Sequence, residues 1–327
     1  MNASAEPAQA SGVTAMGLDG SGGVRLLEPA EAIAPGAGPV WIHIDFANPA
    51  AGEWAWNESG FDETIIAAML DPESRPRCLQ HGSGALTMLR GVNLNPGARL
   101  EDMISVRIWL EPGRVVTAAR RSLRSLTEIR EALNRGDGPG APASFVLELV
   151  ERLNRYIGEG IEKIEANIDK AEDEINLSGG LQSRGAFNHL RRQTAHIRRY
   201  LSPQREALDR LSRIGDPLFS AAESIELREQ LNSLTLNLED LDLVRERALV
   251  AQEEFLGLLA HEQNARMLVL SIVAAVFLPL SFLTGLMGMN VAGLPGTVNP
   301  WSFWILVLLM LLTAGGILAV FHSRKWL

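Results

Sequence analysis

Three adjacent residues near the C-terminal end of the chain, Gly288-Met289-Asn290, have the types that suit contact with a hydrated metal cation. An asparagine side chain offers a carbonyl oxygen without a charge, so a ring of such side chains can contact a cation or its hydration water. A neighbouring glycine allows backbone conformations that are closed to other residues. The alternative is that the tripeptide only caps a helix, because asparagine is frequent at helix C-termini. The tripeptide alone does not distinguish these two roles.

The segments on both sides of this tripeptide are predicted to cross a membrane. Residues 267–323 contain no Asp, Glu, Lys or Arg, and residues 267–287 and 301–321 are both strongly apolar. Each segment has about 20 residues, which at helical rise matches a hydrocarbon layer of about 30 Å. Residues 288–300 are then a short, uncharged loop between two spans.

The basic residues around the spans predict their orientation. Arg266 precedes the first span, Arg324 and Lys325 follow the second, and the loop carries no base. By the positive-inside rule, both termini are cytoplasmic and the loop lies outside the cell. Residues 322–327 form a basic cytoplasmic tail, and the predicted location is the cell inner membrane, among membrane lipids.

The charge and motif content excludes several classes of function. Residues 1–266 carry all 39 acidic residues and 28 of the 30 basic ones, a net charge of −11, which argues against a nucleic-acid partner. The single cysteine, Cys78, excludes an intramolecular disulfide and a cysteine-based zinc finger. No serine-hydrolase, zinc-protease or phosphate-binding glycine motif is present, so the chain is not predicted to be an enzyme.

The chain before the spans is predicted to have three parts. Residues 1–23, rich in Ala, Gly and Ser, are expected to be a mobile leader. Residues 24–140 alternate between strand and helix signals, which indicates a cytoplasmic α/β domain. Residues 141–266 are expected to form a helical hairpin and a long stalk helix that leads into the first span. The stalk carries an apolar stripe of Leu231, Leu234, Leu238, Leu241, Phe255 and Leu258.

Two further sets of residues are candidate cation sites. Glu239, Asp242, Glu246 and Glu253 lie within roughly 60° of one another on the predicted stalk helix, so they form either a cation-attracting funnel or an ordinary solvated face. His43 and Asp45 lie two residues apart on a predicted strand. That spacing is compatible with a regulatory metal site, although a packed or surface pair is the favoured interpretation.

A hairpin of two spans cannot enclose a pore by itself. If the chain conducts an ion, the functional unit is therefore a ring of subunits with one helix from each subunit along the axis. The stalk helix that runs into the first span is the natural lining element. A membrane-tethered scaffold or sensor without transport is the alternative from another functional class.

The position of Gly288-Met289-Asn290, directly after an apolar span and before a second span with a basic end, resembles the CorA-type family of divalent-cation transporters. The resemblance covers the whole chain beyond the leader. It implies a homopentamer with the first span lining the pore and the tripeptide as selectivity motif. The family's pore-facing pattern falls on Met267, Leu270 or Ser271, Ala274, Leu278 and Ser281.

One departure from the magnesium-transporting members indicates which cation is carried. Those members usually have an acidic residue shortly after the asparagine, whereas residues 291–296 here have none. This loop, the segment 104–110 and the closing Arg324-Lys325-Trp326-Leu327 are similar to the ZntB zinc-transporter branch. The resemblance implies zinc as the transported cation and no cofactor, with a magnesium or cobalt channel as the alternative. Export and proton-coupled uptake both stay open.

Overall fold

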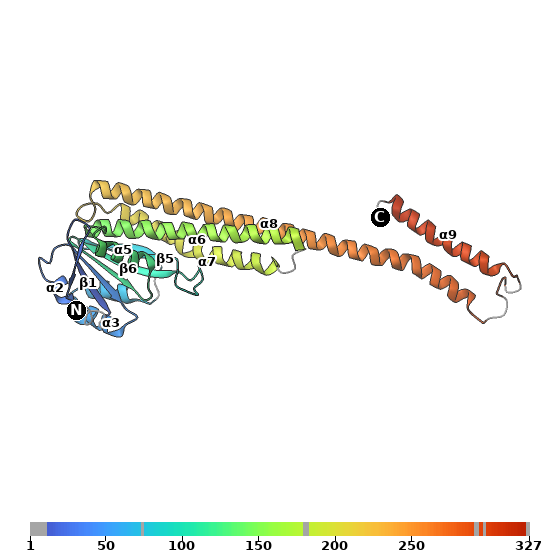
Figure 1. Ribbon diagram of the computed structural model, residues 1–327, viewed down its shortest axis with the longest axis horizontal. Coiled ribbons are helices and arrows are strands. Elements are labelled where there is room, and N and C mark those ends of the chain that lie inside the picture. The colour runs from blue at the N-terminus through green and yellow to red at the C-terminus, as the bar shows by residue number, and fades with distance from the viewer. Residues whose placement is uncertain (1–11, 73–74, 179–182, 291–293, 297–298, 325–327) are drawn as a thin grey trace. The chain divides into compact units, whose positions relative to one another are not determined.

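The structure is a computed structural model that describes residues 12–72, 75–178, 183–290, 294–296 and 299–324. The chain divides into two compact units, Met1–Ala251 and Gln252–Leu327. The first unit contains a β-sheet and a helical bundle, and the second contains the end of one long helix and the C-terminal helix (Figure 1).

The first unit is built on a seven-stranded sheet of order β2-β1-β3-β7-β6-β5-β4. Its strands are β1 (Val13–Leu18), β2 (Val24–Leu27), β3 (Val40–Asp45), β4 (Arg77–His81), β5 (Gly84–Gly91), β6 (Ile104–Glu111) and β7 (Arg114–Ala119). Only the β3–β7 pair of this sheet is parallel. A tight turn joins β6 to β7, and within it Gly113 adopts the left-handed conformation that the turn requires, with φ of +82°.

The prediction of a mobile leader is wrong for residues 13–18. These residues form β1, which pairs with both β2 and β3 and is mostly buried. Val13 and Ala15 are fully buried on one face of the sheet, while Met16 and Leu18 are buried in the hydrophobic core on the opposite face. Both faces of this strand are covered by other parts of the domain. This packing outweighs the preference of the small flanking residues for a mobile segment. Residues 1–11 of the predicted leader lie outside the described residues.

Helices cover both faces of the sheet. The helices α2 (Pro29–Ala32), α3 (Pro49–Asn57) and α4 (Glu63–Leu70) contribute to one core with Ile42, Ile44 and Val116. On the opposite face, α5 (Arg124–Arg135) contributes to a second core with Val106 and Ile108. The helix that follows β3 therefore covers one face of the sheet, and the helix that follows β7 covers the opposite face.

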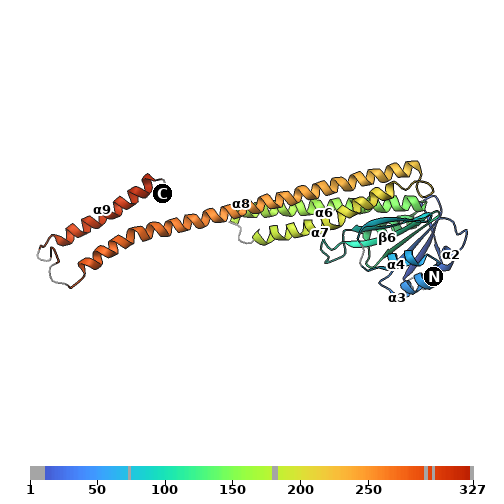
Figure 2. The same ribbon diagram turned by 180° about the vertical axis from the view of Figure 1, so that it is seen from behind.

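The second core continues into a helical bundle. Its helices are α6 (Pro142–Ser178), α7 (Ser183–Ser212) and the first part of α8 (Ala221–Met287), which lie side by side in both views (Figures 1 and 2). Leu234, Leu238 and Leu241 of the predicted stripe are buried in this core. Phe255 of the stripe is also buried, whereas Leu258, three residues further on, is 55% exposed.

Ion pairs connect α8 to both of the other bundle helices. Arg247 on α8 lies 3.0 Å from Glu165 and 2.8 Å from Asp169, both on α6. Arg198 on α7 binds Asp242 on α8. These pairs are partly exposed, so each adds little to the stability of the bundle but helps to set the register of α8 against α6 and α7.

The second unit contains the two predicted spans. The last part of α8 continues through Pro279 without a break, and α9 covers Ser302–Ser323. Both helices have windows long and apolar enough to cross a membrane, and no residue of those windows is buried. An uncovered apolar helix is stable only in lipid or against further helices, which agrees with the predicted spans.

Candidate functional site

The candidate cation motif lies directly after the last residue of α8. The backbone N–H of Gly288 donates to the carbonyl of Thr284 at 2.9 Å, which extends the helical hydrogen-bonding pattern by one residue. Met289 and Asn290 follow, and both are exposed. The Asn290 side chain makes no hydrogen bond to any residue that the structure describes. Its carbonyl oxygen is therefore not used to cap the helix and remains available to an external group.

Gly288 does not adopt the unusual backbone conformation that was expected of this glycine. It does not share the positive φ that Gly113 and Gly296 adopt. A Cβ atom at this position would instead lie 3.1 Å from the Thr284 carbonyl oxygen, closer than side chains normally approach. The position favours glycine because of limited space against the last helical turn rather than because of a left-handed backbone.

All six predicted pore-lining residues are exposed on the last part of α8. Leu270 and Leu278 are 72% and 74% exposed, and the six residues share a sector about 100° wide at helical periodicity. Phe277 and Phe282, which are also strongly exposed, flank this sector. Exposure in one chain therefore does not separate pore-facing from lipid-facing residues, and the pore lining stays a prediction.

The four predicted funnel residues do not share one environment. Asp242 is half-buried and bound by Arg198, while Glu239, Glu246 and Glu253 are exposed. The same stretch of α8 also exposes Leu236, Leu243 and Val250, with exposed fractions of 60%, 58% and 51%. This second apolar row was missed from the sequence, although its seven-residue spacing is the signal that could have revealed it.

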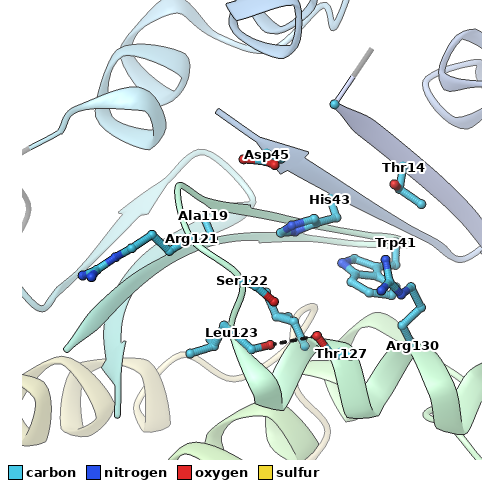
Figure 3. A pocket seen from close by; sticks show the side chains of 12 residues that line it. Thr14, Trp41, His43, Asp45, Ala119, Arg121, Ser122, Leu123, Thr127 and Arg130 are labelled. Atoms are coloured by element: carbon cyan, nitrogen blue, oxygen red, sulfur yellow. Dashed lines mark hydrogen bonds between the residues drawn. The ribbon is translucent and has the colours of Figure 1, made fainter. Parts of the chain in front are cut away.

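His43 and Asp45 both line a pocket of about 280 Å³ between the sheet and α5 (Figure 3). His43 Nδ1 lies 2.9 Å from Thr117 Oγ1, which also accepts a hydrogen bond from Trp41 Nε1 at 2.9 Å. Because the Thr117 hydroxyl already accepts from the indole, its own proton is best placed toward Nδ1. This network assigns the neutral imidazole its proton on Nε2.

The electrostatic environment keeps this histidine neutral. Burial lowers the pKa of His43 to about 4, with the charge of Arg130 acting in the same direction and Asp45 opposing it. Asp45 Oδ1 accepts the backbone N–H of Ala47 at 3.0 Å. No third metal-ligating side chain joins this pair among the described residues. His43 and Asp45 therefore line the same pocket, but His43 is a packed neutral side chain and Asp45 caps the loop that follows β3. This arrangement favours the packed pair over a metal site.

The only cysteine of the chain is likewise a structural residue. Cys78 is 4% exposed, and Thr87 Oγ1 donates to its sulfur at 3.4 Å. Burial raises the pKa of the Cys78 thiol, so the thiolate that would bind zinc is disfavoured.

The comparisons with known proteins decide the family. Residues 36–325 match the protein family described as "CorA-like Mg2+ transporter protein". The chain belongs to this CorA-like family. It is 35% identical over 294 residues to the "Divalent cation transporter CmaX" of Pseudomonas aeruginosa, covering 88% of this chain and 87% of the relative. It is also 31% identical over 310 residues to the "Zinc transport protein ZntB" of Yersinia enterocolitica, covering 95% and 94%.

A solved structure extends the likeness to the whole CorA-like fold. The full-length CmaX structure superposes with a TM-score of 0.83 at 34% identity, covering 97% of this chain and 98% of that chain. The predicted resemblance and the predicted fold class, an α/β domain followed by a long helix and two candidate membrane helices, are therefore confirmed. The chain is thus a member of a family of divalent-cation transporters.

Proposed function

We propose that this CorA-like chain carries divalent cations, zinc foremost, across the inner membrane through a ring of five identical subunits. The observation that carries the proposal is Asn290, an exposed amide without a hydrogen bond to any described residue, which follows an uncovered apolar helix in a chain of a transporter family. In a ring, five such amides surround one axis at the outer mouth of the pore and contact the hydrated ion.

The lack of fixed charge at this mouth favours zinc over magnesium. Mg²⁺ gives up its waters reluctantly and is usually drawn in by carboxylates, and residues 291–296 contain none. Zn²⁺ accepts a wider range of ligands and geometries. Residues 267–321 contain no His or Cys, so zinc is held only by weak contacts with Asn290, Ser281 and the backbone. We therefore expect Ni²⁺, Co²⁺ and Cd²⁺ to pass as well.

The ring is supported by the surfaces that α8 leaves uncovered. Leu236, Leu243 and Val250 form an exposed apolar row on a helix whose other sides pack against α6 and α7. Burial of such a row against neighbouring copies removes apolar surface from water, at roughly 25 cal/mol per Å². Glu239 and Glu246 alternate with this row, so the same contact would bring acidic side chains from all subunits near the axis.

The flanking charges support a single orientation. Arg266 and Arg324 lie at the two ends that would face the cytoplasm, while residues 288–300 carry no base. Glu239 and Glu246 on α8 would then concentrate cations on the cytoplasmic side of the pore. Residues 267–323 contain no carboxylate or lysine, so any proton coupling would not use an acidic relay inside the spans.

Metal flux into liposomes that contain the purified protein tests this function. We expect radiolabelled zinc to enter protein-containing liposomes faster than empty ones, and excess Zn²⁺, Cd²⁺ or Ni²⁺ to suppress this flux more strongly than excess Mg²⁺. The same flux measured with and without a pH gradient reports on proton coupling. Stronger competition by Mg²⁺ would assign the chain to magnesium transport, and no flux of any divalent cation would support a scaffold or sensor.

A further inference from the structure

The pocket that His43 and Asp45 line lies at the carboxyl ends of the two parallel strands, β3 and β7 (Figure 3). Asp45, the last residue of β3, lies opposite Ala119, the last residue of β7. The next helices along the chain, α3 and α5, cover opposite faces of the sheet. In open α/β sheets, ligands bind in the crevice where the chain leaves neighbouring parallel strands toward opposite faces. The position therefore indicates a ligand site, and every lining residue belongs to the first unit.

Two side chains of opposite charge line this pocket without binding each other. Asp45 on β3 and Arg130 on α5 are both exposed, and the guanidinium of Arg130 makes no ion pair or hydrogen bond with any described residue. Asp45 Oδ1 accepts the backbone N–H of Ala47, while its second oxygen has no hydrogen bond to the described part of the chain. The third charged residue of the lining, Arg121, is already paired with Asp102 at 2.7 Å. The pocket therefore offers one positive and one negative charge to a ligand.

His43 lies between these two charges (Figure 3). Besides burial, which lowers the pKa of His43, Asp45 raises this pKa and Arg130 lowers it, so both charges reach the imidazole. The Nδ1 atom faces Thr117, which leaves the Nε2–H as a neutral donor without an acceptor among the described residues. A carboxylate group in the pocket can accept this hydrogen bond next to Arg130.

Uncharged side chains complete the lining and limit the size of a ligand. The hydroxyls of Thr14 on β1 and Ser122 before α5 make no hydrogen bond to the residues that the structure describes. Trp41 and Leu126, both buried, add apolar surface. The volume of about 280 Å³ lies just below the usual range for small-molecule sites, about 300–1,000 Å³. The pocket therefore suits a small polar molecule rather than a nucleotide or a peptide.

We propose that this pocket binds a small zwitterion of the α-amino-acid class, with the ligand's carboxylate at Arg130 and His43 and its ammonium group at Asp45. A guanidinium matches the two oxygens of a carboxylate, and charge-assisted hydrogen bonds are stronger than neutral ones. A simple anion would be repelled by Asp45 and a simple cation by Arg130, whereas a zwitterion is attracted by both. This binding does not require the transported cation, because no described residue of the spans lines the pocket.

Binding to the full-length protein in detergent tests this proposal. In calorimetric titrations in metal-free buffer, at least one of glycine, L-alanine and L-serine is expected to bind saturably, with one molecule per chain, and to raise the melting temperature. Acetate, which lacks the ammonium group, and methylamine, which lacks the carboxylate, are each expected to bind about tenfold more weakly or less, since each loses one charged contact.

Two variants each remove one charge from the pocket. Arg130→Gln is expected to weaken amino-acid binding about tenfold or more, since it removes the charged hydrogen bonds to the carboxylate. Asp45→Asn is expected to weaken this binding similarly but to strengthen acetate binding, because the charge that repels acetate is gone. Both positions are exposed, and the asparagine keeps an oxygen for the Ala47 N–H, so both variants should fold. Arg135→Gln, at an exposed position of α5 outside the pocket, is the matched control and should bind like the native chain.

Several results would overturn the proposal. No saturable binding of any of the three amino acids would exclude the ligand class. Equal binding of acetate or methylamine to the native chain would show that the ligand does not need both charges. Equal effects of Arg130→Gln and Arg135→Gln would place the carboxylate elsewhere. Equal weakening of acetate and amino-acid binding by Asp45→Asn would show that Asp45 is not the partner of the ammonium group.

Discussion

The guanidinium of Arg198 on α7 holds the carboxylate of Asp242 on α8 through two hydrogen bonds, of 2.5 Å from Nε and 3.1 Å from Nη2. This pair raises the pKa of Arg198, and the opposite charges of the two side chains largely offset each other. Asp242 is therefore a bundle contact, and the negative charge available to passing cations rests with its exposed neighbours.

The exposed glutamates on α8 are expected to raise the local cation concentration. Glu246→Gln is predicted to lower the zinc flux a few-fold at low ionic strength, and this difference should disappear in high salt because exposed charges are screened. Asp242→Asn, matched in size and charge change, should affect the flux less. Flux rates of the three proteins at two salt concentrations check this. A larger effect of Asp242→Asn would contradict our assignment.

The exposed apolar row on α8 is expected to hold the ring together. Leu243→Asp is predicted to dissociate the oligomer, because it places a charge in a surface that is apolar and buried in the ring. Leu79→Asp, at an exposed leucine on β4, is the control and should leave the oligomer intact. Mass measurement in mild detergent reports both. A native protein that runs as a uniform monomer or dimer would count against the ring itself.

Acidification is predicted to destabilise the first unit through His43. Its pKa is about 4 in the folded protein against an ordinary 6.5, so the unfolded chain takes up a proton first as the pH falls. The contribution of His43 to the free energy of unfolding is then constant above about pH 6.5 and decreases as the pH falls from 6.5 to about 4. His43→Asn, which keeps an acceptor for Thr117, should flatten this part of the melting-temperature profile. His196→Asn, at an exposed histidine on α7, should keep the native slope.

Two glycines near the end of α8 form a matched pair. Gly288→Ala is predicted to reduce zinc flux several-fold, because its Cβ would lie 3.1 Å from the Thr284 carbonyl and displace Asn290. Gly285 lies inside α8, where a Cβ would meet nothing within 4 Å besides the helix's own backbone, so Gly285→Ala should transport at close to the native rate. Equal rates for the two variants in liposomes would show that the close contact at Gly288 is unimportant.

The sequence predicts the elements that carry strong local patterns. The spans lack charge over residues 267–323, so they were expected close to where the apolar helices lie, and the strand and helix signals of residues 24–140 predicted the α/β domain. In contrast, β1 and β4 were missed. Small residues surround β1, and four of the five residues of β4 are exposed at the sheet edge, so tertiary pairing decides both strands.

The candidate sites divide in the same way. Asn290 could be identified from the sequence because the features that mark it, the apolar span before it and the short loop after it, are adjacent to it in the chain. The Arg198–Asp242 pair spans 44 residues, and the His43–Thr117 contact spans 74 residues across β3 and β7. No local spacing encodes such contacts, because they arise only when distant segments pack.

The zinc flux of Asn290→Ala relative to the native protein, measured in liposomes at matched protein content, tests the central claim most directly. Asn299→Ala is the control, since Asn299 is an exposed asparagine of the same loop whose side chain accepts the Trp301 N–H at 3.0 Å. We expect Asn290→Ala to assemble normally by mass but to transport no faster than empty liposomes, while Asn299→Ala retains flux. Native zinc flux by Asn290→Ala would contradict the account.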